Sequence, residues 1–487
     1  MNKMRRICLA IIFLLLAAFG ASAATAADKV AADPRVKSAL ELARIWLEAQ
    51  RAYDRIPGVS AAIVYDQLVL WSGGYGYTDL SKKTPATAST IYSICSISKL
   101  FTSIAVMQLR DAGKLRLDDP VEKLLPWFKI QKTAPHGPEI TVEGLLTHAS
   151  GLPRESEYPY WTAPDFSFPS REQVKEKISS QQTLYPAETH FQYSNLGITL
   201  AGEVVAAASG EPYDQYVKGH VLDPLGLTST TPEIPAGQRG NRLATGYRTL
   251  TRDGEPKAMP FFQVRGIAPA AGYASTAEDL AKFACWQFRL LGAGGTEILA
   301  ANTLREMYRI HWVEPDFETT WGLGFEVWRR NGKLFVGHGG SCPGFRSGVL
   351  FRPEEKVAAI FLSNAHEAAS EAFAQCLYDI VAPAIKDAVK NPSAAKKPDP
   401  KLNKYLGTYS DWDGERAVFL WGDGLAAMGL PTMNPVKSIV KLKKTGEHTF
   451  RRVRDDEELG EEVVFEIGPD GRAARLKWHS NYCPRIR

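Results

Sequence analysis

The stretch IYSICSISKLFTS, residues 91–103, decides the fold because it sets Ser96 three positions before Lys99 at the start of an apolar segment. We expect a helix from Ser96 to Ala112, with Gly113 as its stop signal. Residues i and i+3 of a helix share a face, so the Lys99 amine can reach the Ser96 hydroxyl. A serine becomes a good nucleophile only when a base takes its proton, and an unprotonated lysine is such a base. This stretch therefore predicts a nucleophile at a helix start.

The Ser-x-x-Lys pattern alone is a weak signal, because the chain contains it at Ser96, Ser393 and Ser438. Ser393 lies in a polar linker and Ser438 in an expected strand, so only Ser96 opens a helix. The N-terminus of that helix offers positive potential to an oxygen that gains negative charge. Judged by itself, the pattern is more often a capping serine beside a solvated lysine.

A second motif, Tyr193-Ser194-Asn195, stands where a loop meets an expected helix over 195–208. A tyrosine beside a lysine cation can have its pKa lowered towards that of a useful base. The asparagine offers donor and acceptor atoms to both a lysine and a substrate amide. The alternative interpretation is a buried tyrosine followed by a helix cap.

A third motif, VGHGGSCPGF at residues 336–345, lies at the end of an expected strand. Gly339 and Gly340 after His338 leave a backbone that a substrate can approach closely. The backbone N–H of Ser341 would be well placed as an oxyanion donor beside that of Ser96. The alternative is a glycine-rich hairpin that carries an incidental histidine.

Taken in order, the three motifs resemble the serine β-lactamase and penicillin-binding-protein superfamily. Three further segments support the resemblance: LLTHASGLP (145–153), GYASTAEDL (272–280) and WGLGFEV (321–327). The likeness is closest to the class C β-lactamase-like branch, with its esterase and D-amino-acid peptidase relatives. It covers residues 35–390.

The resemblance implies an α/β fold, in which helices flank a β-lactamase-like antiparallel sheet and an all-helical subdomain is set beside it. It also implies that Ser96 is the acylated nucleophile and that Lys99 and Tyr193 share the role of base. The other implied roles are substrate positioning, by Asn195, His338 and Gly340, and an oxyanion hole made by the backbone N–H groups of Ser96 and Ser341.

The third motif departs from that of the antibiotic-hydrolysing members, which typically carry Lys-Thr-Gly. Histidine at 338 is largely neutral at pH 7, so a fixed cation for an anionic substrate is missing. Arg346 is a candidate replacement, although a surface arginine is the simpler interpretation. We therefore expect a serine hydrolase that cleaves esters, small amides or peptides. The alternatives are a penicillin-binding or sensor-like protein that acylates with little turnover, and a true β-lactamase.

Two cysteines flank the implied oxyanion hole, Cys95 before Ser96 and Cys342 after Ser341. If both amides bind one oxyanion, each nitrogen lies about 3 Å from it and the two are roughly 5 Å apart. The cysteine Cα atoms would then fall within the roughly 4.4–6.8 Å of a disulfide. The placement resembles a bridge found in class A carbapenemases. The alternative is two small buried residues that fill core space.

The first 27 residues have the layout of a secretory signal peptide, with the basic segment MNKMRR, an apolar run of 14 residues and small residues for cleavage. We expect the mature protein to be exported, periplasmic or secreted, and without a membrane anchor, because the apolar run is too short to span a bilayer. Removing the leader lowers the net charge from +4 to about +1. That charge gives no argument for a nucleic-acid partner.

We expect a catalytic domain over 28–389, a proline-containing linker over 390–403 and a small antiparallel β domain over 404–487. The strands expected in the β domain are RAVFLW, SIVKLKK, HTFRRV, EVVFEI and ARLKWH. The catalytic domain should contain a hairpin over 58–79 and the strands KLFVGH, SGVLFRP and VAAIFLSN. Its other helices are expected at 35–53, 118–125, 141–147, 170–180, 277–291, 301–308 and 367–387.

No pattern in the sequence predicts a metal or cofactor. His366-Glu367 lacks the second histidine of a zinc-protease helix, and no dinucleotide-binding or P-loop pattern appears between a strand and a helix. The expected partner is a small ester, amide or peptide substrate. The loops expected to line its pocket, around 154–170, 235–270 and 310–320, carry no readable specificity.

Overall fold

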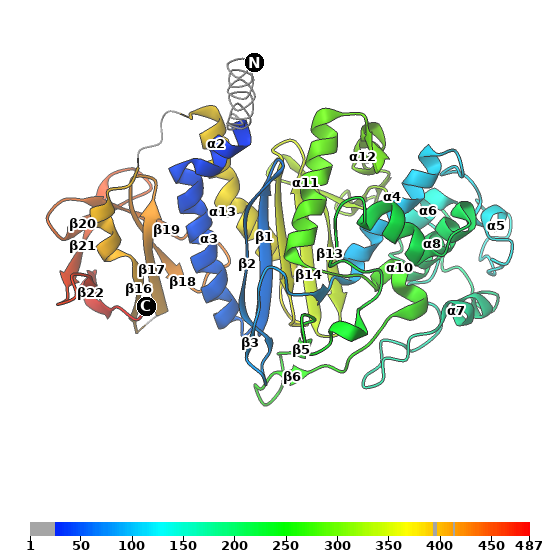
Figure 1. The fold of residues 1–487 in the computed structure, drawn as a ribbon, viewed down its shortest axis with the longest axis horizontal. Coiled ribbons are helices and arrows are strands. Elements are labelled where there is room, and N and C mark those ends of the chain that lie inside the picture. The colour runs from blue at the N-terminus through cyan, green and yellow to red at the C-terminus, as the bar shows by residue number, and fades with distance from the viewer. Residues whose placement is uncertain (1–24, 393–396, 413) are drawn as a thin grey trace, which may run out of the picture.

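The structure is a computed structural model that describes residues 25–392, 397–412 and 414–487 (Figure 1). Most of the expected signal peptide and residues 393–396 of the expected linker lie outside the described residues. Among the helices of the described part, none is long and apolar enough to cross a membrane.

A nine-stranded antiparallel sheet forms the centre of the molecule. The expected hairpin is present as β1 (Gly58–Tyr65) and β2 (Leu68–Asp79), and the three expected strands are present as β13 (Lys333–Cys342), β14 (Phe345–Arg352) and β15 (Val357–Ser363). β1 pairs with β15, so strands from the two ends of the catalytic region lie side by side. The remaining strands are β3 (Thr84–Pro85), β10 (Trp312–Val313), β11 (Thr320–Trp321) and β12 (Glu326–Arg330).

Helices cover both faces of this sheet, which explains why β1 and β15 are apolar and buried along their length. α3 (Pro34–Tyr53) and α13 (Ser370–Lys390) lie together on one face, and α11 (Ala277–Ala293) covers the other (Figure 1). α11 begins at Thr276, whose hydroxyl accepts a hydrogen bond from the Asp279 N–H at 3.1 Å. That cap fixes where the helix starts.

The all-helical part stands beside the sheet, on the side of α11 (Figure 1). Its central helix, α8 (Asn195–Ser209), is apolar on nearly every side and packs among its neighbours, as such a composition requires. The other helices of the region are α4 (Ser98–Asp111), α5 (Val121–Leu124), α6 (Val142–Leu146), α7 (Arg171–Ile178), α9 (Tyr213–Val217), α10 (Ala268–Ala271) and α12 (Ala301–Met307). Two-stranded ribbons join its loops: β4 (Tyr92–Ser93) with β7 (Ala274–Ser275), β5 (Tyr247–Arg248) with β6 (Lys257–Ala258), and β8 (Thr296–Glu297) with β9 (Leu299–Ala300).

The C-terminal region is an eight-stranded antiparallel sheet that follows chain order and closes like a barrel through a bridge between Tyr409 and Arg485. A 3₁₀ helix, Pro400–Tyr405, precedes it at the end of the expected linker. The strands are β16 (Gly407–Asp411), β17 (Gly414–Trp421), β18 (Gly424–Leu430), β19 (Ile439–Lys444), β20 (Thr449–Val453), β21 (Leu459–Ile467), β22 (Ala473–Trp478) and β23 (Asn481–Pro484). The sequence predicted β17 and β19 to β22 but not β16, β18 or β23.

The barrel packs against α3, which lies between it and the central sheet (Figure 1). Phe419 and Met428 of the barrel belong to the same buried cluster as the inner faces of α3 and α13. At the edge of this contact, Trp46 Nε1 donates a hydrogen bond to the Thr432 carbonyl oxygen at 2.7 Å. The two regions therefore share one hydrophobic cluster, while the interior of the barrel forms a separate one.

Candidate active site

Ser96 lies in a single 3₁₀ turn, η1 (Cys95–Ile97), which leads directly into α4. Cys95 has φ of +53°, a left-handed conformation that costs energy for a residue other than glycine. The turn is held from outside: the Ser98 hydroxyl donates to the Cys95 carbonyl oxygen and accepts from the Tyr273 N–H at 2.9 Å. The expected helix start is thus present, with Ser96 on a constrained turn.

Lys99 has no exposed surface and contacts three oxygen atoms. Its Nζ lies 3.1 Å from Ser96 Oγ, 2.8 Å from Asn195 Oδ1 and 2.8 Å from the Ala270 carbonyl oxygen. Burial lowers the pKa of Lys99 to about 7, although the charge of Glu155 opposes this. A neutral amine has two N–H groups and one lone pair. The amide and carbonyl oxygens accept the two N–H groups, so the lone pair faces the Ser96 hydroxyl.

Tyr193 lies close to Ser96, whose side chain lowers the pKa of the tyrosine by hydrogen bonding. Its ring centroid is 4.8 Å from Lys99 Nζ. Burial raises the pKa of Tyr193 well above its ordinary value, more than Ser96 and Arg154 lower it. The expectation that a neighbouring lysine lowers this pKa is therefore wrong, because burial of the tyrosine itself outweighs the groups that lower it. Tyr193 is a neutral hydroxyl in this environment.

His148, from the segment LLTHASGLP, holds the Tyr193–Asn195 turn in place. Its Nδ1 accepts a hydrogen bond from the Ser194 N–H at 3.1 Å, and its ring lies 4.3 Å from that of Tyr193. Burial keeps the pKa of His148 well below its ordinary value, so the imidazole is neutral. The Ser194 hydroxyl caps α8 by accepting from the Gly197 N–H at 2.8 Å. Backbone and side chain of this turn are thus both fixed.

The third motif lies on β13, which runs against the turn that carries Ser96. The Ser347 hydroxyl of β14 donates to the Ile94 carbonyl oxygen at 2.9 Å. At Gly340, a Cβ atom would lie only 2.3 Å from the same oxygen, so only glycine allows the strand to come this close. The approach brings the backbone of Ser341 to the neighbourhood of Ser96.

His338 is 5% exposed and lies beside the rings of Tyr193 and Trp321. Its Nδ1 is 2.5 Å from the Gly339 carbonyl oxygen, while Nε2 has no hydrogen-bond partner. Burial lowers the pKa of His338 to about 3, so the ring is neutral and supplies no cation. The Nε of Arg346, the candidate replacement, donates to the His366 carbonyl oxygen at 2.6 Å, and its role towards a substrate stays a prediction.

The structure brings Cys95 and Cys342 together, but as free thiols. The Ser93 hydroxyl lies between them, 3.6 Å from Cys95 Sγ and 3.7 Å from Cys342 Sγ. Both side chains are buried, and burial raises the pKa of the Cys95 thiol. In the structure they fill space beside the turn that carries Ser96, and the disulfide stays a prediction.

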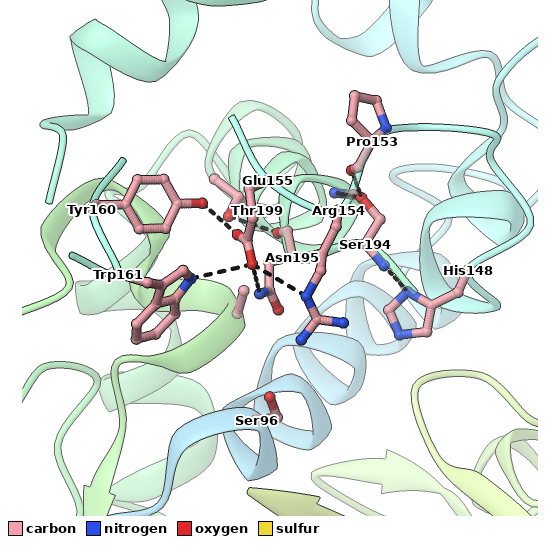
Figure 2. A network of polar contacts seen from close by, with 12 residues as sticks. Ser96, His148, Pro153, Arg154, Glu155, Tyr160, Trp161, Ser194, Asn195 and Thr199 are labelled. Atoms are coloured by element: carbon pink, nitrogen blue, oxygen red, sulfur yellow. Dashed lines mark hydrogen bonds and ion pairs between the residues drawn. The ribbon is translucent and has the colours of Figure 1, made fainter. Parts of the chain in front are cut away.

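Glu155 is a residue of the site that the sequence did not reveal. Figure 2 shows its carboxylate among Asn195, Tyr160 and Trp161, with the Arg154 side chain alongside. The available signal was its place two residues after LLTHASGLP, in a loop already expected to line the pocket. A single glutamate in a polar loop is otherwise indistinguishable from a solvated surface residue.

Comparison with known proteins gives a family and several relatives. A family model described as Beta-lactamase matches residues 45–377. Beta-lactamase-like protein 2 of Dictyostelium discoideum is 28% identical over 385 residues, which cover 77% of this chain and 69% of that protein. Protein flp of Staphylococcus aureus (strain MW2) is 28% identical over 309 residues, which cover 63% of this chain and 60% of that protein. The chain thus spans 60 to 69% of the length of these two relatives.

Three solved structures share the fold. The octameric penicillin-binding protein homologue from Pyrococcus abyssi has a TM-score of 0.63 at 24% identity, covering 92% of this chain and 98% of its own. EstCE1, a hydrolase with promiscuous acyltransferase activity, has a TM-score of 0.60 at 24% identity, with coverages of 71% and 99%. The D-stereospecific amidohydrolase from Streptomyces sp. has a TM-score of 0.56 at 24% identity, with coverages of 73% and 99%.

Proposed function

The chain belongs to the beta-lactamase family, and from that premise we propose that it is a serine hydrolase which cleaves esters or small amides and peptides through an acyl-enzyme on Ser96. One observation carries the proposal: the buried Lys99 amine lies 3.1 Å from Ser96 Oγ, with both of its N–H groups directed at other acceptors. Its pKa of about 7 makes the unprotonated form abundant at neutral pH.

In the proposed reaction, Lys99 takes the proton of Ser96 as Oγ attacks the substrate carbonyl carbon. The backbone N–H groups of Ser96 and Ser341 stabilise the negative oxygen that forms. The leaving alcohol or amine receives the proton, through Lys99 or the Tyr193 hydroxyl, and the acyl group remains on Ser96. Water then attacks this ester and Lys99 accepts the water's proton. As the bond to Ser96 Oγ breaks, Lys99 returns that proton to Oγ, which releases the acid product and restores the free serine.

The substrate class follows from the third motif. His338 is neutral and its Nε2 has no partner, so this edge of the site offers a hydrogen-bonding nitrogen where a cation would be needed for an anionic β-lactam. The names of two structural relatives, a hydrolase with acyltransferase activity and a D-stereospecific amidohydrolase, support esters and amides as substrates. As part of the same proposal, the basic and apolar first 27 residues direct the protein out of the cytoplasm.

The decisive experiment compares two serines that share the Ser-x-x-Lys pattern. Ser96→Ala should abolish both p-nitrophenyl ester turnover and covalent labelling by a serine-directed phosphonate. Ser438→Ala serves as the matched control, because Ser438 bonds Asn434 and Thr432 in the barrel, away from the site, and should leave both signals unchanged. Undiminished turnover in Ser96→Ala would refute the proposal.

Intact-mass spectrometry after a pulse of ester or penicillin then separates hydrolase from receptor. A hydrolase returns to its unmodified mass, because deacylation follows acylation. An adduct that persists for hours would instead assign the protein to the acylating receptors. Nitrocefin hydrolysis would identify a β-lactamase.

A further inference from the structure

The Glu155 carboxylate collects hydrogen-bond donors from three side chains (Figure 2). Its Oε1 accepts from Asn195 Nδ2 at 2.7 Å and from Trp161 Nε1 at 3.2 Å. Its Oε2 accepts from the hydroxyl of Tyr160, a side chain that is 1% exposed. Arg154 Nε lies 3.5 Å from Oε1. This many donors fix the carboxylate in one place.

The contact with Asn195 determines which way its amide faces. An asparagine amide has a donor end and an acceptor end of nearly the same shape, whereas an ionised carboxylate only accepts. The NH₂ group must therefore face Glu155, which turns Oδ1 towards Lys99 Nζ at 2.8 Å. A reversed amide would aim its N–H groups at the amine and take away one of its acceptors.

The loop that carries Glu155 is anchored on both sides. The Arg154 carbonyl oxygen accepts from the Asn195 N–H at 2.8 Å, which ties the loop to the first residue of α8. The Glu155 carbonyl oxygen accepts from Gln181 Nε2 at 3.2 Å. The carboxylate is thus held in position by the fold before any substrate arrives.

Building on the proposed function, we propose that Glu155 is a positioning residue: it holds the Asn195 amide in the one orientation that accepts a hydrogen bond from Lys99, and so keeps the lone pair of the amine on Ser96. Glu155 touches neither Ser96 nor Lys99 and acts through Asn195. A line of contacts thus runs from the aromatic side chains of the loop to the nucleophile.

The charge of Glu155 has a second effect on Lys99. Burial lowers the pKa of the amine, Glu155 raises it, and Arg154 lowers it. Four other ionisable groups near Lys99 are neutral at pH 7: burial lowers the pKa of His148 and His338 and raises that of Tyr193 and Cys95. The Cys342 thiol is a fifth group that acts on the amine. The negative charge of Glu155 therefore raises the pKa of the Lys99 amine, which without it would lose its proton at a lower pH.

Glu155→Gln tests the proposal, because glutamine has the same shape but presents both a donor and an acceptor. Both orientations of the Asn195 amide then become available, and the negative charge is lost. We expect kcat for a p-nitrophenyl ester to fall on the order of 100-fold with little change in KM. We also expect the acid limb of the kcat/KM profile to move to lower pH by about one unit.

Two further variants make the result specific. Glu157→Gln removes the same charge from the same loop, but Glu157 is exposed and pairs with Lys177 at 3.1 Å, so both kcat and the acid limb should stay unchanged. Glu155→Asp keeps an acceptor-only, charged group and should leave the acid limb where it is, even if the shorter side chain reduces kcat. If a Glu155 variant were partly unfolded, kcat would fall but the acid limb of the kcat/KM profile would stay at the same pH. Wild-type kcat with an unmoved limb in Glu155→Gln overturns the proposal.

A readout independent of turnover separates this inference from the proposed function. In a Ser96→Ala background, the ¹³Cε resonance of Lys99, assigned by its absence in Lys99→Arg, reports the pKa of the amine by NMR. We expect Glu155→Gln to lower that pKa by about one unit. An unchanged titration of Lys99 in Glu155→Gln would refute the role of Glu155. If the protein that retains Ser96 shows no turnover, only the proposed function is refuted.

Discussion

Lys99 is the residue whose protonation state should govern activity. Burial lowers the pKa of its amine from 10.5 to about 7, so the form able to take a proton from Ser96 appears as the pH rises through 7. We predict that kcat/KM for an ester rises with pH, is half-maximal near pH 7 and falls about tenfold per unit below about pH 6. A flat profile from pH 5 to 9 would contradict this assignment.

One other group in the neighbourhood titrates in the same range. Burial and the nearby Glu371 raise the pKa of Glu326 to about 7. Glu326 belongs to β12, on the sheet, and its charge acts on Tyr193. Glu326→Gln is therefore the control that assigns the acid limb: the limb should persist in this variant, since it belongs to Lys99.

The site residues that the sequence revealed make contacts that are local in the chain, whereas the residue it missed depends on contacts that only the fold creates. Ser96 and Lys99 are coupled within one helical turn, so spacing alone predicts their contact. Asn195 follows its tyrosine in a short motif with a fixed order. Glu155, in contrast, acquires its role from Tyr160, Trp161 and Asn195, which only the folded chain brings to one carboxylate. The pKa of Tyr193 likewise depends on burial, which no motif encodes.

At the scale of elements, the close approach of β13 to η1 rests on Gly340. A Cβ atom there would meet Ser347 Oγ at 2.1 Å and the Ile94 carbonyl oxygen at 2.3 Å. We predict that Gly340→Ala moves the strand away from the nucleophile turn, lowers kcat/KM on the order of 100-fold and lowers the free energy of unfolding by about 1–3 kcal/mol. Kinetics and urea denaturation measure the two effects.

Gly429→Ala is the matched control for this substitution. Gly429 also lies in a β-strand, but a Cβ atom there would meet nothing within 4 Å. Its stability should change by no more than about 0.5 kcal/mol, with activity unaffected. Equal losses of activity and stability in Gly340→Ala and Gly429→Ala would show that any glycine in a strand matters. The close approach of β13 to Ser96 would then not be the cause.

Elements with strong local signals were predictable, and those without were not. α3, α8 and α13 combine length with apolar spacing, and β13 to β15 are rich in branched and aromatic residues. β18 (GLAAMGL) was missed because alanine and glycine carry little preference for a strand. Its place in the sheet comes from pairing with β17 and β19, a property of the barrel and not of its own residues.

At the scale of the whole molecule, the barrel and the catalytic region should unfold together. Phe419 is 1% exposed and belongs to the cluster that includes α3 and α13. We predict that Phe419→Ala lowers the free energy of unfolding by about 3–5 kcal/mol. Circular dichroism and loss of Ser96 labelling should report the same, lowered midpoint.

The control is Val436→Ala, also in the C-terminal region but at a side chain that is 41% exposed. It should leave the midpoint close to that of the wild type. Two separate transitions in Phe419→Ala, with the labelling of Ser96 lost only in the later one, would show that the barrel is an independent unit.

The pairing of β1 with β15 also determines when the central sheet can form during synthesis of the chain. Val59 lies opposite Ser363, so the first long strand of the central sheet has no neighbour on that side until about 300 further residues have been made. At roughly 5–20 residues per second, that interval lasts roughly 15–60 seconds. During this time an apolar strand and its hairpin exist without the sheet that buries them. A hairpin that waits this long for its neighbouring strand exposes apolar surface and an unpaired edge, which makes the incomplete chain prone to aggregation.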